Sequence, residues 1–587
     1  MEYLRLRGIG VSPGISIGEV LLTKRVIFSS RKDGILPEQL DNEIARLEKA
    51  IERTQRQLTT IKDKVKEKVG EEHSFIFDAH LLIVKDSSLF ASLKKIITEN
   101  MTRAEWAISQ IHEQYMIEFE SIADEYFRER KFDVSDVLSR VYKNLEPFEP
   151  KRTHDDKDKI LVGHDLLPSE AALRLSQGNV LAVALDMGGQ TSHTAILARS
   201  LNIPAVVGLR NITKRVKNGD ILIVDGTDGE VLINPPLATE KEFISKKKRY
   251  ENYRKELRKT AKLKSLTLDG ERFYPLANIE LPNEVKPAFS LGAEGIGLFR
   301  SEFIYLHSTS LPSEEEHYNA YYQCAKVAHP AQVYIRTMDI GGEKSLPQLK
   351  IEKEPNPALG LRAIRFSLRD RELLKTQLRA ILRASVFKNV RILIPMITEY
   401  EEIIEVKNLF EEVKGELRSQ KIKFDTHIPL GIMIEVPAAA AMTDVLVREV
   451  DYLSIGTNDL IQYYLAVDRS NELVSYLFKP LHPSILRILK FIIETTQAAG
   501  KEITVCGEMA ADPLSALVLL GFGLRKFSMN PIFIPRIKEV LRSVENKTIR
   551  RIVRKAMQLN SAQEIEEYII ERVLVKYPKA FLMGQKN

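Results

Sequence analysis

Cysteine is scarce in this chain of 587 residues, which contains only two, Cys324 and Cys506. Two cysteines so far apart exclude a disulfide framework and a zinc site built from four thiolates. The sequence also lacks any run of about 18 apolar residues, and it begins without the apolar stretch of a signal peptide. We therefore expect a cytoplasmic protein with no membrane partner.

A large excess of one charge sign is also missing. The 86 lysines and arginines exceed the 80 acidic residues by only six. The one dense basic run, residues 241–264, holds eleven basic and three acidic residues and neither glycine nor proline. This run predicts a solvated connecting helix at a domain boundary, and we expect no nucleic acid partner. Hydrophobic residues at 44% and charged residues at 28% are typical of soluble globular proteins.

The distribution of glycine and apolar residues divides the chain into parts. Residues 1–24 and 145–235 hold short β-branched runs between glycines. Between them, residues 25–144 are nearly free of glycine, and apolar residues recur every three or four positions, as at Leu40 and Ile44. We predict a mixed α/β domain (1–24 and 145–235) with a helical bundle inserted over 25–144, and a linker helix over 236–264.

In residues 265–587, short apolar strands alternate with helical patterns. This alternation predicts a (β/α)8 barrel of the TIM type. Seven strands can be recognised, at 273–279, 295–299, 333–336, 390–396, 430–434, 453–455 and 503–505. The sequence therefore predicts a multi-domain α/β protein that ends in a barrel.

A charged residue stands at or just after the end of several of these strands. These residues are Arg300, Arg336, Glu435, Asp459 and Glu508. Active sites of such barrels lie at the C-terminal ends of the strands, so we expect arginines and carboxylates to converge at one mouth. Guanidinium groups match phosphate and carboxylate oxygens, while Mg²⁺ takes carboxylate together with phosphate ligands. The pattern predicts a small phosphorylated acid bridged by a divalent cation.

Three more residues can join this mouth. Asn458 offers an amide to phosphate oxygens, and Arg469, ten residues on, can clamp the same group. Cys506 follows a predicted strand and has two interpretations, a buried small hydrophobe or a group that exchanges a proton with the substrate. Cys324, in a helical stretch, has no comparable claim.

A single histidine has an unusual setting. His193 follows the turn at Gly188 and Gly189, and either Thr191 or Ser192 can cap the helix that starts there. The free amides and the positive dipole end of such a helix favour a phosphoryl group on the imidazole by about 0.3 to 1 kcal/mol. We therefore consider His193 a covalent phosphoryl carrier, with a histidine that merely fills a surface turn as the alternative.

Together these motifs resemble enzyme I of the phosphoenolpyruvate-dependent sugar phosphotransferase system, along essentially the whole chain. The shared segments are 188–193, 295–303, 339–342, 356–360 and 431–469. The resemblance implies Mg²⁺-dependent autophosphorylation by phosphoenolpyruvate, release of pyruvate, and phosphoryl transfer to the carrier protein HPr. It also implies a swivelling phosphohistidine domain, docking of HPr on the inserted bundle, and a homodimer formed through the barrel.

The resemblance assigns roles to single residues. His193 matches the phosphohistidine, phosphorylated on Nε2, and Cys506 matches the acid that protonates the enolate carbon. Glu435 and Asp459 match the Mg²⁺ ligands. The residues that match the phosphoenolpyruvate contacts are Arg300, Arg336, Asn458, Asp459 and Arg469, with Arg362 near them.

Three positions depart from the family pattern. Gln190 stands where arginine is usual, Ala171 where threonine is frequent, and His307-Ser308 where an acidic or amide residue precedes arginine. These departures leave open a paralogue that feeds a regulatory, nitrogen-type cascade. A dikinase or phosphoenolpyruvate synthase would need a large nucleotide-binding domain ahead of the histidine domain, and only the helical insert is available there. A regulatory protein without turnover is disfavoured by the intact set of matched site residues.

Overall fold

The structure is a computed structural model that describes residues 3–23, 28, 31–68, 76–121, 131–145, 158–176, 178–189, 192–306, 311–341, 354–469, 471 and 473–577. Gln190, Thr191, His307 and Ser308 lie outside these residues. The chain divides into two compact units, Met1–Tyr253 and Arg254–Asn587. Across the described ranges, no helix combines the length and the apolar character that a membrane crossing requires.

The first unit is built on an eight-stranded sheet with the order β1-β8-β7-β3-β4-β5-β6-β2. The strands are β1 (Leu4–Arg7), β2 (Ile9–Ser12), β3 (Ile15–Leu22), β4 (Lys159–Gly163), β5 (Val180–Leu185), β6 (Ala205–Val207), β7 (Ile221–Asp225) and β8 (Glu230–Ile233). β3 pairs in parallel with β4, with Val20 opposite Ile160, although a long helical segment separates the two strands in the sequence. That segment is therefore inserted between two neighbouring strands.

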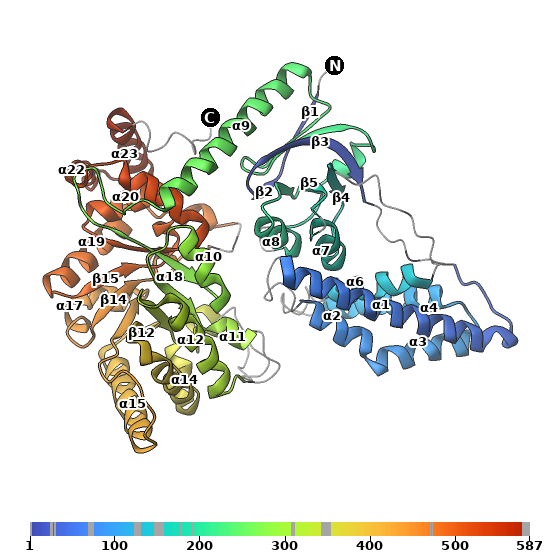
Figure 1. Ribbon diagram of the computed structural model, residues 1–587, viewed down its shortest axis with the longest axis horizontal. Helices are drawn as coiled ribbons and strands as arrows, with labels where there is room; N and C mark the ends of the chain where they lie inside the picture. The colour runs from blue at the N-terminus through green and yellow to red at the C-terminus, as the bar shows by residue number, and fades with distance from the viewer. Residues whose placement is uncertain are drawn as a thin grey trace. The chain divides into compact units, whose positions relative to one another are not determined.

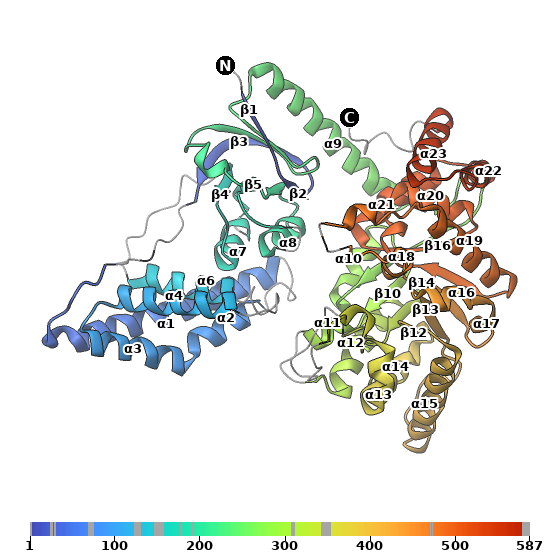
Figure 2. The same ribbon diagram turned by 180° about the vertical axis from the view of Figure 1, so that it is seen from behind.

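Apolar residues cover both faces of this sheet, because successive side chains of a strand point to opposite sides. On one face, Leu161 and Val183 pack with residues of α7 (Pro168–Ser176) and α8 (His193–Ser200). Both helices lie on the same side of the sheet in the two opposite views of Figures 1 and 2. On the other face, the side chain of Ile160 packs in a separate apolar cluster.

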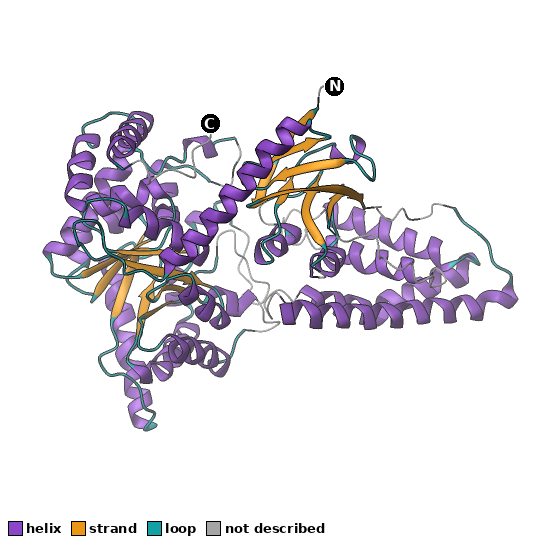
Figure 3. Cartoon of the chain, turned by 45° about the horizontal axis from the view of Figure 1, so that its top comes forward, coloured by secondary structure: helices purple, strands orange, loops and turns teal. Residues whose placement is uncertain are grey.

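Most described residues of the inserted segment are helical, with short loops between the helices (Figure 3). Its helices are α1 (Leu40–Lys68), α2 (Ile76–Lys85), α3 (Ser87–Asn100), α4 (Ala104–Ser121) and α6 (Lys131–Leu145). Leu47, Leu58 and Val65 of α1 are fully buried, as expected for one face of an amphipathic helix. Asp136 of α6 joins the bundle to α7, since its carboxylate accepts hydrogen bonds from the Ser169 backbone N–H at 2.7 Å and the Ser169 hydroxyl at 2.6 Å.

Helix α9 (Leu237–Ala261) runs across the boundary between the units. Near its start, Phe243 packs with Ile15 of the sheet, and Lys246 Nζ donates to Asp225 Oδ2 at 2.7 Å. At its end, Lys538 Nζ donates to the Ala261 carbonyl at 2.9 Å. A lysine satisfies a carbonyl that the helix itself leaves unpaired, so each end of α9 is fixed to one unit.

The second unit is a closed barrel of eight parallel strands, which confirms the predicted (β/α)8 architecture. The strands are β9 (Tyr274–Ile279), β10 (Ile296–Arg300), β11 (Val333–Arg336), β12 (Val390–Ile394), β13 (Leu430–Ile434), β14 (Tyr452–Ile455), β15 (Glu502–Val505) and β16 (Lys526–Met529). The pattern of apolar runs had indicated the first seven but not β16. That strand is four residues long and contains a lysine and a serine, so it lacks an apolar run.

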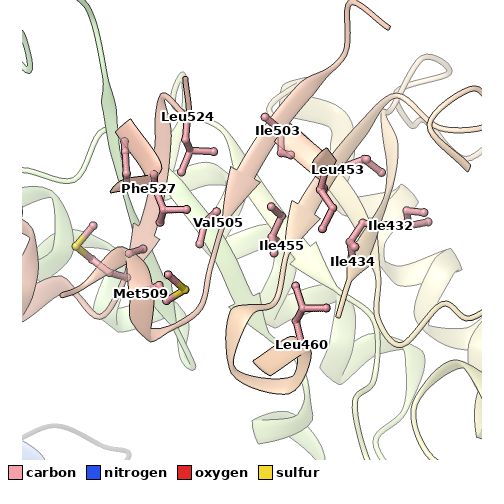
Figure 4. Packing of buried hydrophobic residues seen from close by; sticks show 14 of the residues in the cluster. Ile432, Ile434, Leu453, Ile455, Leu460, Ile503, Val505, Met509, Leu524 and Phe527 are labelled. Atoms are coloured by element: carbon pink, nitrogen blue, oxygen red, sulfur yellow. The ribbon is translucent and has the colours of Figure 1, made fainter. Parts of the chain in front are cut away.

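Helices surround the barrel strands in Figures 1 and 2. They are α10 (Val285–Ser290), α11 (Glu302–Leu306), α12 (Glu314–Ala328), α13 (Ile364–Arg369), α14 (Arg371–Ala384), α15 (Tyr400–Ser419), α16 (Pro437–Ala441), α17 (Thr443–Leu446), α18 (Thr457–Leu465), α19 (Pro483–Ala498), α20 (Pro513–Gly521), α21 (Ile534–Arg542), α22 (Asn546–Ala556) and α23 (Ala562–Lys576). Ile432, Ile434 and Ile455 belong to the core that these helices form with the strands (Figure 4). Met433 belongs instead to a separate cluster inside the barrel.

Candidate active site

The two-residue period of the strands decides which side chains enter the barrel. Leu298, Tyr334 and Met433 belong to the interior cluster, so residues two positions later point to the same side. Those residues are Arg300, Arg336 and Glu435. They stand at the C-terminal ends of β10, β11 and β13, where barrel enzymes carry their active sites.

Two arginines stand side by side at this mouth, because Arg300 of β10 pairs directly with Arg336 of β11. Arg300 is partly exposed, and its Nη1 donates to Glu280 Oε1 at 2.9 Å. Arg336 is buried between two carboxylates: Nη2 donates to Glu302 Oε1 at 2.5 Å, and Nη1 lies 3.0 Å from Asp339 Oδ2. Burial by itself would lower the pKa of Arg336, but Glu302 and Asp339 raise this pKa above its ordinary value. The guanidinium group of Arg336 therefore keeps its positive charge.

A third arginine connects the two sides of the mouth. Arg362 Nε donates to Asp339 Oδ1 at 3.1 Å, and Nη2 donates to Asp459 Oδ2 at 2.8 Å. Its Nη1 donates to the Tyr463 hydroxyl at 2.9 Å. Burial opposes the charge on Arg362, but Asp339 and Asp459 raise its pKa above the ordinary value. Arg362 and Arg336 thus share the Asp339 carboxylate.

Glu435 is a buried carboxylate beside these arginines. Its Oε1 accepts a hydrogen bond from the Met396 backbone N–H at 2.7 Å. Burial, together with the negative charges of Asp459 and Asp339, raises the pKa of Glu435 to about 8. A Cβ atom at Gly456 would lie 2.5 Å from Glu435 Oε2, so only glycine leaves room for the carboxylate here.

Glu435 and Asp459 fit a hard divalent cation. They supply oxygen ligands, and Mg²⁺ is commonly held by one or two carboxylates with water and substrate phosphate completing its shell. Burial is the main reason for the raised pKa of Glu435, and repulsion from Asp459 adds to it; a bound cation would offset this repulsion. Within the ranges that the structure describes, no group of three or more histidine, cysteine or acidic side chains has a metal-binding arrangement. A cation at these two carboxylates would therefore need further oxygens from substrate and water.

Asn458 and Arg469 meet at Glu508 on the rim. Asn458 Nδ2 donates to Glu508 Oε1 at 3.0 Å, and the Glu508 backbone N–H donates to Asn458 Oδ1 at 2.9 Å. Arg469 Nη1 donates to the same Glu508 oxygen at 3.4 Å. The Arg469 and Glu508 side chains are 42% and 77% exposed. An anionic ligand can therefore reach the groups that Glu508 contacts here.

Cys506 lies at the end of β15 and belongs to the interior cluster of the barrel. The Ser454 hydroxyl donates to its Sγ at 3.5 Å, and Sγ donates to the Ile455 carbonyl at 3.5 Å. Burial raises the pKa of Cys506 to about 11, although the Ser454 hydrogen bond and the charges of Arg336 and Arg300 act to lower it. The thiol therefore keeps its proton at neutral pH and lies within the field of the mouth arginines.

His193 lies in the other unit, as the first residue of α8. Of the two predicted caps, Ser192 takes the N-cap position, and its Oγ accepts from the Ala195 N–H at 3.4 Å. Gly188 in the preceding turn has a φ of +113°, in the region that favours glycine. The unpaired amides and the positive dipole end of α8 are therefore located at His193. Ala171 is fully buried in α7.

The structure brings most of the predicted site residues together at the barrel mouth. His193 belongs to the first unit, whereas the mouth residues belong to the second. Three residues that contact Arg336 or Arg362 at the mouth were not among those predicted: Glu302, Asp339 and Tyr463. Glu302 and Asp339 stand inside the segments 295–303 and 339–342, so their place in these motifs was the available signal. Tyr463 lies one helical turn after Asp459 in α18, so the two residues share one face of the helix. Their proximity could be predicted only after the helix itself had been predicted.

Three protein-family models match the chain. A model described as "PEP-utilising enzyme, PEP-binding domain" matches residues 254–546, which include the barrel mouth. A model described as "PEP-utilising enzyme, mobile domain" matches residues 155–229, which include His193. A model described as "PEP-utilising enzyme, N-terminal" matches residues 7–130.

Curated relatives match over nearly the whole length of the chain. The phosphoenolpyruvate-protein phosphotransferase of Haemophilus influenzae is 41% identical over 572 residues, which cover 97% of this chain and 99% of the relative. The protein of the same name from Geobacillus stearothermophilus is 40% identical over 565 residues, covering 96% and 97%. The one from Staphylococcus carnosus is 38% identical over 568 residues, covering 97% and 99%. The similarity thus extends over both units.

Proposed function

The chain belongs to the phosphoenolpyruvate-protein phosphotransferases, which are enzymes, and on that premise we propose how its two units divide the reaction. Phosphoenolpyruvate binds at the barrel mouth and passes its phosphoryl group to His193, and pyruvate leaves. The phosphorylated histidine then passes the group to the carrier protein HPr. The observation that carries this proposal is the meeting of Arg336, Arg362, Glu435 and the protonated thiol of Cys506 at one mouth.

In this proposal the arginines bind the two anionic ends of the substrate. Guanidinium groups form paired hydrogen bonds with phosphate and carboxylate oxygens, and the paired strand ends hold two of these groups next to each other. Asn458 and Arg469 exchange their contacts with Glu508 for contacts with the substrate. The substrate-binding set is then Arg300, Arg336, Asn458, Asp459, Arg469 and Arg362.

The proposed metal ligands are Glu435 and Asp459. Bound Mg²⁺ would neutralise charge on the phosphoryl and carboxylate oxygens of the substrate, as it does in other phosphoryl transfers. Arg362 donates to Asp459 at 2.8 Å and orients this carboxylate toward the mouth.

The chemistry then needs one nucleophile and one acid. A ring nitrogen of His193 forms a bond to phosphorus while the bond between phosphorus and the enol oxygen of the substrate breaks, and its electron pair stays on the enolate. The Cys506 thiol gives its proton to the methylene carbon of the enolate, which produces pyruvate. The thiolate regains a proton from solvent. A pKa of about 11 suits Cys506 to this role, since the thiol is protonated before each turnover.

The proposal also covers movement and partners. Because His193 and the mouth belong to different units, the reaction requires His193 to reach the mouth, and α9 has to permit this movement. The helical bundle α1–α6 docks HPr, and the barrel forms a homodimer. The domain boundaries that accompany this assignment are 1–24 and 145–235 for the phosphohistidine domain, 25–144 for the bundle, 236–264 for the linker and 265–587 for the barrel.

Intact-mass measurement tests the central step. The full-length protein is incubated with phosphoenolpyruvate and Mg²⁺, and pyruvate is measured in the same sample. We expect a mass increase of one phosphoryl group in the wild type and in His427→Ala, a matched control at an exposed histidine of the second unit. His193→Ala should gain no mass. Full labelling of His193→Ala would show that the assignment is wrong.

A transfer assay tests the partner. Phosphorylated protein is separated from excess phosphoenolpyruvate and mixed with HPr. We expect the phosphoryl group to appear on HPr and to disappear from the enzyme. An unchanged enzyme mass in the presence of HPr would exclude HPr as the acceptor.

A further inference from the structure

A buried amide behind the mouth joins two of its strand ends. Gln377 of α14 is 1% exposed. Its Nε2 donates to the Ser301 hydroxyl at 2.9 Å, and its Oε1 accepts from the Met338 backbone N–H at 2.9 Å. Ser301 stands between Arg300 and Glu302, directly after β10, while Met338 follows Arg336 at the end of β11 by two positions.

The orientation of this amide is fixed by its partners. Only the carbonyl oxygen of Gln377 can accept from the Met338 N–H, so the NH₂ group faces the two hydroxyls of Ser301 and Tyr321. The second of these bonds, from Nε2 to the Tyr321 hydroxyl, is also 2.9 Å long. Gln377 thus makes three hydrogen bonds to three different segments of the chain.

The network continues into α12 and is anchored there. The Tyr321 hydroxyl lies 3.0 Å from His317 Nδ1, and it can donate to this nitrogen because its oxygen already accepts from Gln377. Burial lowers the pKa of His317 to about 4, so the imidazole is a neutral acceptor at pH 7. The side-chain polar atoms of Gln377, Ser301 and Tyr321 have hydrogen-bond partners here, whereas His317 Nε2 has none among the described residues. Such a buried network holds its segments in place, because each lost bond leaves a desolvated polar group.

The segments that Gln377 joins are those that carry the carboxylates of the mouth. Glu302 follows Ser301, and Asp339 follows Met338. Both carboxylates contact Arg336, and Asp339 also contacts Arg362. A shift of either segment would therefore move a carboxylate on which the position of a guanidinium group depends.

We propose that Gln377 is a positioning residue for the reaction at the barrel mouth. It sets the distance between the end of β10 and the end of β11, and so the spacing of Arg300 and Arg336, which receive the substrate. The inference rests on the proposed function, since the spacing matters only if the two arginines bind one ligand. Displacement of a binding group by about 1 Å can cost up to about 100-fold in rate.

A purely structural role of Gln377 is the alternative, and Asn389 supplies a matched control. Asn389 is 5% exposed, and its Nδ2 donates to the carbonyls of Ala325 at 3.0 Å and Ala331 at 2.9 Å. It directly precedes β12, so it lies at the end of the barrel opposite the mouth. Asn389→Leu therefore removes a buried amide of the same kind beside the starts of β11 and β12, at the opposite end of the barrel from Arg300 and Arg336.

The experiment compares Gln377→Met, Gln377→Glu and Asn389→Leu in the full-length protein. Binding of phosphoenolpyruvate is measured by calorimetry, pyruvate release gives KM and kcat, and thermal unfolding gives the loss of stability. Methionine keeps the length of glutamine but makes none of its hydrogen bonds. Glutamate keeps the acceptor for the Met338 N–H and presents a second oxygen to which the Ser301 and Tyr321 hydroxyls can donate.

We expect Gln377→Met to lower kcat/KM by about 10- to 100-fold, mainly through KM. Gln377→Glu should recover part of this loss, and Asn389→Leu should lose comparable stability with an unchanged KM. Ser301→Ala removes one of the three bonds and should lower kcat/KM about threefold to fivefold. This milder variant tests the inference even if Gln377→Met does not fold.

Four results would overturn the inference. Wild-type KM and kcat in Gln377→Met, or in Ser301→Ala if the first variant does not fold, would show that the network has no role at the mouth. An equal effect of Asn389→Leu would show a purely structural role, as would a Gln377→Glu protein no more active than Gln377→Met. A wild-type chain that binds no phosphoenolpyruvate would instead contradict the proposed function, and the inference would fall with it.

Discussion

Arg336 donates a hydrogen bond to Glu302 across 2.5 Å, and the two side chains are 6% and 0% exposed. The removal of two charges from water is costly, and such a pair contributes little to stability compared with an apolar pair of the same shape. The pair instead serves to position Arg336, because Glu302 holds the guanidinium group in one orientation before any ligand arrives. A preorganised cation needs no rearrangement when charge develops on the substrate.

Glu302→Gln should reduce kcat/KM for phosphoenolpyruvate about tenfold, because Arg336 loses one of its two charged partners and gains freedom to move. The free energy of unfolding of the barrel should fall by about 1 to 3 kcal/mol, since Asp339 still pairs with Arg336. Steady-state pyruvate release and urea unfolding measure the two effects. Glu280→Gln is the control, because the pair of Glu280 with Arg300 is 37% exposed on both sides and should contribute less than about 1 kcal/mol. An equal loss of stability in the two variants would contradict this account.

Cys506→Ala should slow pyruvate release by about 100- to 10,000-fold, the range expected when a general acid is removed. Phosphoenolpyruvate binding, measured by calorimetry, should change little, because the thiol is proposed to act on carbon and not to hold the substrate. Cys324→Ala removes the other cysteine, which is fully buried in α12, and should leave turnover unchanged. Wild-type turnover in Cys506→Ala would exclude the thiol as the acid.

Removal of divalent cations with a chelator should stop pyruvate release, and Mg²⁺ should restore it. In Glu435→Gln, the Mg²⁺ concentration for half-maximal rate should rise by at least about tenfold, because one of the two proposed ligands loses its charge. Glu502→Gln is a matched control at the start of β15, where Glu502 pairs with Lys526 at 2.9 Å and Arg391 at 2.7 Å. The proposed site would be wrong if both variants shifted the Mg²⁺ requirement equally.

Acid should destabilise the barrel through His317. Burial lowers the pKa of His317 to about 4 in the folded protein, against about 6.5 in an unfolded chain, while Glu316 acts in the opposite direction. The unfolded state therefore binds the proton more strongly, and this contribution to stability is complete above pH 6.5 and is lost as the pH falls toward 4. The loss should amount to about 3 kcal/mol.

Urea unfolding followed by the tyrosine signal in near-ultraviolet circular dichroism measures this effect between pH 4 and 7.5. His317→Gln keeps an acceptor for the Tyr321 hydroxyl but cannot titrate. Its stability should therefore lack this part of the pH dependence. A variant that follows the wild-type pH profile would show that another group is responsible.

The sequence was sufficient to predict the barrel because its strands are buried on both sides and read as short apolar runs between helical patterns. It also predicted the mouth, since charged residues at the ends of parallel strands must meet at one edge. β16 was not predicted, because Lys526 and Ser528 interrupt its apolar pattern, although the closed barrel requires a strand there.

The contacts within the mouth were beyond the reach of sequence patterns. Asp339 receives hydrogen bonds or ion pairs from Arg336 and Arg362, which come from two different segments, and no local spacing encodes this meeting. The cap of α8 was open between Thr191 and Ser192, and the backbone geometry assigns it to Ser192. The roles of His193 and of the mouth residues remain predictions that the experiments above address.

Gly456, directly after β14, has no side chain, and this leaves space for Glu435, directly after β13. Since a methyl group there would come within 2.5 Å of a Glu435 oxygen, no other residue can enter position 456 unless residue 435 also shortens or turns away. We therefore expect that, during evolution, positions 456 and 435 are substituted together or both stay unchanged. A lineage that kept the carboxylate in this orientation would also keep the glycine.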